Sequence, residues 1–121
     1  MSTNNDAIEK ARTDVQNLHK QLEASAAKNQ AALRTDVQNA GMQAQKLADA
    51  LRTAGEGQHA EAQRHLKDAA ARLDEAAKHA RDVAGAGETQ LKETNQAMLS
   101  KARDAVQKLS EAIASRRTAK V

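Results

Sequence analysis

Two glycine pairs divide the sequence: Ala54-Gly55-Glu56-Gly57-Gln58 and, 30 residues later, Ala84-Gly85-Ala86-Gly87-Glu88. The chain contains no proline, so these glycines are its strongest helix-terminating signals. Thirty residues before the first pair lies Ser25–Asn29, a small and polar stretch that we interpret as a weaker break. Three breaks predict four helices of similar length. Their expected ranges are about 5–27, 30–54, 58–84 and 88–116.

Apolar residues recur every three or four positions within each of these segments, which is the spacing of one face of an α-helix. The stripe is narrow and rich in alanine, as in the seam of a helical bundle. We therefore predict an all-α fold, an antiparallel four-helix bundle that forms a single domain over residues 1–121. The expected core residues are Val15, Leu18, Leu22, Leu33, Val37, Leu47, Leu51, Leu66, Leu73, Leu91, Leu99, Val106, Leu109 and Ile113.

A second repeat competes with this division. Residues 12–17, Arg-Thr-Asp-Val-Gln-Asn, recur unchanged as residues 34–39, at an offset of 22. Twenty-two residues make about six helical turns, so both copies would face the same way on one continuous helix. The alternative architecture is therefore one long helix over 5–54 with two shorter helices folded back on it. We favour the break, because the apolar stripe shifts register between Leu22 and Leu33, where Asn29 takes a core position.

Large apolar side chains are few in this sequence. Val, Ile, Leu and Met together number 20, alanine numbers 28, and aromatic residues are absent. Burial of a leucine or isoleucine stabilises a fold by roughly 1.5–3 kcal/mol, and burial of an alanine by much less. Because shared burial would supplement so thin a core, we expect self-association or a protein partner.

Residues capable of catalysis or metal binding form no recognisable site in the sequence. Glu61/His65 and Glu75/His79 repeat on one helical face, but their spacing is four, whereas bundle metal sites place His three residues after Glu. We interpret this face as solvated. The chain has no cysteine, no G-x-S-x-G turn and no phosphate-binding loop. We therefore predict no catalytic residue, metal site or cofactor, and a non-enzymatic structural or protein-interaction module.

The basic character of the chain is confined to its carboxyl end. The formal net charge is +3, and residues 1–115 carry 16 basic and 16 acidic side chains. The whole excess comes from Arg116, Arg117 and Lys120 in the tail, residues 116–121. A balanced body without aromatic residues is a weak electrostatic footprint for nucleic acid. Weak nucleic-acid association through this tail is an alternative function that we rank below the others.

The sequence shows no membrane or export signal. No apolar run approaches the roughly 18 residues of a transmembrane helix. The first residues, Met1–Asp6, are polar and lack the basic and then apolar pattern of a signal peptide. We expect a cytoplasmic protein, with non-classical export left open.

The alanine-rich, proline-free helical pattern and the 22-residue repeat of Arg-Thr-Asp-Val-Gln-Asn resemble several groups of bacterial and repeat proteins. These are the phasins that coat polyester granules, the late-embryogenesis-abundant and apolipoprotein-like chains with 11- and 22-residue repeats, and small helical-bundle proteins of Burkholderia-type bacteria. The resemblance extends over most of the chain. It implies an amphipathic protein that binds a lipid membrane, a granule or another polymer surface, and it assigns no functional residue.

Overall fold

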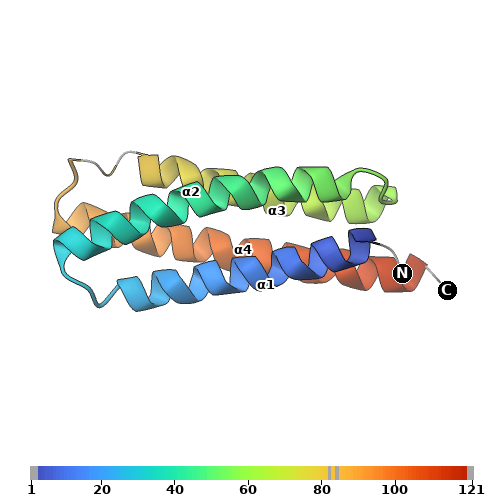
Figure 1. Ribbon diagram of the computed structural model, residues 1–121, viewed down its shortest axis with the longest axis horizontal. Helices are drawn as coiled ribbons and strands as arrows, with labels where there is room; N and C mark the ends of the chain where they lie inside the picture. The colour runs from blue at the N-terminus through green and yellow to red at the C-terminus, as the bar shows by residue number, and fades with distance from the viewer. Residues whose placement is uncertain (1–2, 82, 84, 120–121) are drawn as a thin grey trace.

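The computed structural model describes the backbone of residues 3–81, 83 and 85–119 and the side chains of residues 8–81, 83 and 85–114. Within these residues the chain forms four α-helices and no strand. They are α1 (Thr3–Ser25), α2 (Gln30–Gly55), α3 (Ala60–Arg81) and α4 (Glu88–Ala119). Consecutive helices run antiparallel, α1 packs against α2 and α4, and α3 packs against the same two helices (Figure 1). The predicted four-helix bundle is confirmed.

A turn at residues 26–29 separates α1 from α2, so the alternative of one helix over 5–54 is wrong. Asn29, which we expected in a core position, is exposed and extended, with φ −69° and ψ 170°. Its side-chain oxygen accepts a hydrogen bond from the N–H of Ala32 at 3.0 Å, so Asn29 is the N-cap of α2. α1 ends at Ser25 instead of 27, because the N–H groups of Ala26 and Lys28 donate three residues back, at 3.3 and 3.0 Å.

The other helix ends also differ from the expected ranges. α2 ends at Gly55 instead of 54, and α3 begins at Ala60 instead of 58. Gly57, between them, has φ 83°, a left-handed conformation that glycine adopts without steric cost. α3 ends at Arg81, and residues 82 and 84, near the predicted end at 84, lie outside the described residues. α4 extends to Ala119, beyond the predicted end at 116.

The core consists of the predicted apolar stripes together with many alanines. All of the expected core residues are buried except Leu47 and Val106, which are partly buried and pack against the core. Alanine contributes most on α3. Its buried alanines are Ala62, Ala69, Ala70, Ala76, Ala77 and Ala80. Such short side chains bring helix backbones close together.

The approach of α2 to α3 is tight enough to require a glycine. A Cβ atom added at Gly41, in the middle of α2, would lie 2.4 Å from the Cβ of Ala80 on α3. Carbon atoms in favourable contact are about 3.5–4.0 Å apart. Gly41 is outside the glycine pairs that divide the chain, and its role follows from packing rather than from chain reversal.

We expect Gly41→Val to lower the free energy of unfolding by about 1–3 kcal/mol, because the added methyl groups overlap Ala80. Ala50 on the same helix is exposed, so Ala50→Val provides a matched control that changes helix propensity alone. Urea denaturation followed by circular dichroism measures both variants. Equal losses in the two variants would show that α2 and α3 are not closely packed at Gly41.

Candidate functional site

Two of the four residues on the Glu/His face of α3, His65 and Glu75, contact α4, whereas Glu61 and His79 are exposed as expected. His65 Nδ1 lies 3.4 Å from Glu111 Oε2, and Glu75 Oε2 lies 2.7 Å from the Nζ atom of Lys101, both on α4. The hydrogen bond from Lys101 holds the pKa of Glu75 below its ordinary value. In the described part of the chain, no three His, Cys, Asp or Glu side chains are placed to hold a metal ion. These side chains join α3 to α4.

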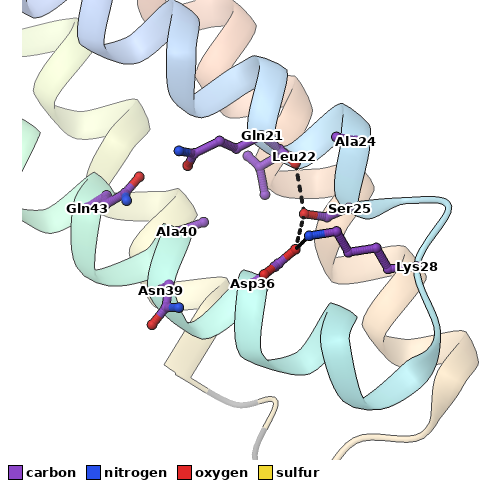
Figure 2. A pocket seen from close by; sticks show the side chains of 9 residues that line it. All are labelled: Gln21, Leu22, Ala24, Ser25, Lys28, Asp36, Asn39, Ala40 and Gln43. Atoms are coloured by element: carbon purple, nitrogen blue, oxygen red, sulfur yellow. Dashed lines mark hydrogen bonds and ion pairs between the residues drawn. The ribbon is translucent and has the colours of Figure 1, made fainter.

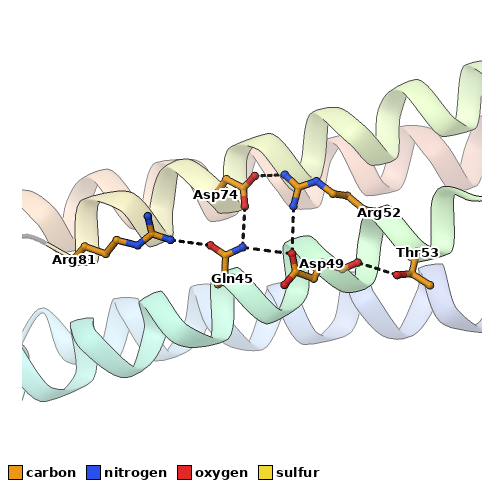
Figure 3. Close-up of polar contacts among 6 residues, drawn as sticks. All are labelled: Gln45, Asp49, Arg52, Thr53, Asp74 and Arg81. Atoms are coloured by element: carbon orange, nitrogen blue, oxygen red, sulfur yellow. Dashed lines mark hydrogen bonds and ion pairs between the residues drawn. The ribbon is translucent and has the colours of Figure 1, made fainter.

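A second polar network joins α2 to α3 (Figure 3). Arg52 on α2 donates to Asp74 on α3 and also to Asp49, one turn back, at 3.4 Å. The amide of Gln45 donates to Asp49 and Asp74, both at 3.4 Å, and its carbonyl accepts from Arg81 at 3.2 Å. Ion pairs as exposed as these contribute about 0–1 kcal/mol each. Each contact therefore stabilises the pairing of α2 and α3 only slightly. Gln45 and Arg81 also line an open hollow of ≈330 Å³ between these two helices, beside Gly41 and Ala80.

The seam between α1 and α2 is hollowed along its length. Two adjoining hollows of ≈290 and ≈310 Å³ share Gln21 and Gln43 in their linings. We call this pair of hollows the amide groove, because exposed carboxamides form its walls, Asn17 and Gln21 from α1 and Asn39 and Gln43 from α2. Figure 2 shows three of these side chains around the first hollow. The apolar residues of the lining are Leu18, Leu22, Ala24, Ala40 and Leu47.

The 22-residue repeat builds both ends of the amide groove. Asp14 and Asn17 of the first copy line one hollow, and Asp36 and Asn39 of the second copy line the other. The valine between each pair, at positions 15 and 37, is fully buried and fixes the same helix face toward the core. Because α1 and α2 are antiparallel, the identical segments lie at opposite ends. The groove therefore has two chemically similar ends.

A polar cluster lies at the end of the groove nearest the α1–α2 turn (Figure 2). Lys28 Nζ lies 2.6 Å from Asp36 Oδ2, and Ser25 Oγ lies 2.8 Å from both Asp36 Oδ2 and the carbonyl oxygen of Gln21. Ser25 is buried, and its single proton is donated to one of these acceptors at a time. The hydrogen bonds from Lys28 and Ser25 hold the pKa of Asp36 below its ordinary value of 3.8.

This pKa shift predicts how the cluster responds to acid. Because the folded pKa of Asp36 is depressed, its stabilising contribution is fully present well above pH 3.8 and is lost as the pH falls below that value. We expect Asp36→Asn to cost at most about 1 kcal/mol near pH 6 and almost nothing near pH 2. Urea midpoints of both proteins across this range measure the difference. A difference that does not change with pH would contradict the ion pair.

Asn95 on α4 is buried, 1% exposed, at a core position that the apolar pattern skips. Its Nδ2 atom donates to the carbonyl oxygen of Leu22 at 3.0 Å. That carbonyl lies in the last turn of α1, where the N–H of Ala26 donates to Glu23 at 3.3 Å instead. Carbonyls at a helix end require an external partner. Asn95 on α4 thus supplies a hydrogen-bond donor to the end of α1. The signal for this contact in the sequence is a polar residue four positions after Leu91, where the apolar stripe predicts an apolar one.

We expect Asn95→Ala to lower the free energy of unfolding by about 1–3 kcal/mol, because it leaves the buried carbonyl of Leu22 without this donor. Gln96→Ala, one position along the same helix and exposed, is the control and should change stability by less than about 0.5 kcal/mol. Chemical denaturation measures both. Similar stabilities of the two variants would show that the hydrogen bond contributes little.

Comparison with protein-family models, with curated proteins and with solved structures finds no match. The resemblance to phasins and related chains therefore stays a prediction. The side chains of Arg116 and Arg117, and Lys120 altogether, lie outside the described residues, so the expected nucleic-acid contact is likewise untested. Among the described helices none is long and apolar enough to cross a membrane.

Proposed function

We propose that this protein is a non-enzymatic interaction module that binds an amphipathic helix of a partner protein in the amide groove. The supporting observation is the lining of the groove. Carboxamide side chains form its walls along a partly apolar seam between the antiparallel helices α1 and α2. A third helix laid along such a seam buries its apolar stripe between α1 and α2.

The chemistry of the walls favours a polypeptide of low net charge. A carboxamide both donates and accepts hydrogen bonds and carries no charge, so it pairs equally well with amide, hydroxyl and carboxylate side chains. The charged residues at each end are of mixed sign, Asp14 with Lys46 at one end and Asp36 with Lys28 at the other. Such a surface produces little net field to attract a phosphate backbone or an anionic membrane.

Binding to a lipid or granule surface in the manner of a phasin would require a different state of the bundle. Met42, 63% exposed, is the single large apolar side chain that is exposed among the described residues. Amphipathic helices that bind lipid insert a continuous apolar face into the interface. The closed bundle buries its faces, so this alternative needs the helices to separate first.

Site-specific photocrosslinking in the cells that make this protein tests the proposal. A benzoylphenylalanine at Gln43 lies on the wall of the amide groove, whereas one at Gln96 lies on an exposed face of α4 and serves as the control. We expect a protein adduct at Gln43 alone, and mass spectrometry should place the crosslink in an amphipathic helical segment. A synthetic peptide of that segment is then titrated by calorimetry.

Two variants make the titration specific to the groove. Gln21→Ala combined with Asn39→Ala should weaken binding of the peptide at least tenfold, whereas Gln90→Ala combined with Gln107→Ala, both exposed on α4, should leave it unchanged. Equal crosslinking at positions 43 and 96, or an adduct with lipid or nucleic acid instead of protein, would overturn the proposed function.

A further inference from the structure

We infer that α1 exchanges between two copies of this chain, with Asn29 as the hinge. In the exchanged dimer α1 and α2 of each chain join into one continuous helix, and each α1 packs against α2 and α4 of the other copy. This inference goes beyond the proposed function and does not rest on it. The amide groove is re-formed in the exchanged dimer by α1 of one copy and α2 of the other.

The connection between α1 and α2 needs little change to become helical. Residues 26–28 already form i→i−3 hydrogen bonds that continue the winding of α1. The carbonyl of Asn29 already accepts from the N–H of Leu33 at 2.8 Å, as in α2 itself. What interrupts the helix is the ψ angle of Asn29, 170° instead of the helical value of about −42°. Joining the two helices therefore requires the ψ angle of Asn29 to change to the helical value and residues 26–28 to pass from i→i−3 to i→i−4 hydrogen bonds.

The α1–α2 connection is held by the Lys28–Asp36 ion pair and the Asn29 cap, and the other two connections are held by different features. The α2–α3 turn contains Gly57 at φ 83°, and the described residues include no other amino acid type at positive φ. The α3–α4 connection is tied to α2, because the guanidinium of Arg34 donates to the carbonyl of Ala86 at 2.7 Å. By contrast, residues 24–34 contain neither glycine nor proline, and alanine occupies five of the eleven positions. Their intrinsic preference is helical.

α1 is also the helix with the fewest ties to its neighbours among the described side chains. Its own ion pairs, Lys10–Asp14 and His19–Glu23, are internal, whereas ion pairs across the interfaces join α3 to both α2 and α4. Both of its flanks are hollowed, by the amide groove on the α2 side and by a hollow of ≈340 Å³ on the α4 side. The latter lies between Gln16 and His19 of α1 and Arg103 and Val106 of α4.

When α1 leaves its position against α2 and α4, the segment that best fits the vacated position, called the seat, is another copy of α1. The seat buries Ile8, Val15, Leu18 and Leu22, and Asn95 donates to the end of the helix that lies in it. A second copy of α1 remakes these contacts without change. The closed and exchanged forms therefore differ mainly at the hinge. There the Asn29 cap and the Lys28–Asp36 ion pair favour the closed form, whereas helix continuity and protein concentration favour exchange.

Opposite substitutions at the hinge test this inference. Asn29→Ala removes the cap and favours helix, which penalises the closed form of each chain about fivefold, so we expect the association constant to rise about 25-fold. Gln30→Pro suits the first position of α2 and holds residue 29 extended, but it breaks a continuous helix. We expect it to abolish exchange. Ala60→Pro, at the first position of α3, is the matched control and should leave association unchanged.

Crosslinking distinguishes exchange from simple docking of two bundles. Gln16→Cys and Arg103→Cys, at two exposed positions beside the hollow between α1 and α4, provide the reactive pair, and the chain has no cysteine of its own to compete. Proteins are refolded at high concentration, separated by size exclusion with light scattering, and treated with a short bismaleimide. On a denaturing gel, exchanged dimers give a band at twice 13.0 kDa, whereas docked bundles give only the monomer band.

The expected result is a covalent dimer that increases with Asn29→Ala and disappears with Gln30→Pro, with helicity by circular dichroism retained. A monomer at every concentration in Asn29→Ala, or a dimer that crosslinks only within chains, would overturn the inference. If Asn29→Ala does not fold, the comparison of the natural sequence with Gln30→Pro and Ala60→Pro decides. None of these outcomes depends on whether a partner helix binds the amide groove.

Discussion

The bundle depends on the close approach of helices whose contacts are made by alanine and glycine. Short side chains remove little apolar area from water, so they stabilise the fold only where backbones come close enough for dense packing. At Gly41 and Ala80 this closeness leaves no space for another carbon atom. α1 carries larger residues at its buried positions, Ile8, Leu18 and Leu22 among them, and hollows accompany it on both sides. A hollow of ≈330 Å³ also lies between α2 and α3, beside Gly41 and Ala80, so side-chain size alone does not decide where the surface is hollowed.

Polar contacts complete what this apolar core leaves open. Asn95 satisfies the end of α1 from across the bundle, and Ser25, Lys28 and Asp36 join that end to α2. These contacts gather at the end of α1 that adjoins the turn. These polar contacts orient α1 against α2 and α4. Burial of the apolar side chains of α1 supplies most of the stabilisation, because a single such hydrogen bond contributes about 1 kcal/mol. The polar contacts therefore specify the position of α1, and the burial of its apolar side chains keeps it there.

The sequence predicted those parts of the structure that depend on neighbours along the chain. The glycine pairs and the helical spacing located the helices to within a few residues, and the apolar stripes identified the core, with Leu47 and Val106 at its edge. Asn29 was assigned correctly to a break but given the wrong role, because a core position and a cap fall at the same place in the pattern. Gly41, Asn95 and the amide groove depend on which helices meet. Asn95 and Leu22 are 73 residues apart, and no local pattern pairs them.

The turn at residues 26–29 links sequence ambiguity to a physical property. The features that left two architectures open, a repeat in phase with a continuous helix and a connection without glycine or proline, are also the features that make straightening of the turn inexpensive in free energy. One cap and one polar cluster select the closed form. Where a sequence supports two helical paths almost equally, the balance between them shifts with concentration, because exchange is bimolecular and closure is not. The continuous helix that the monomer does not form is thus the expected structure of each chain in an exchanged dimer.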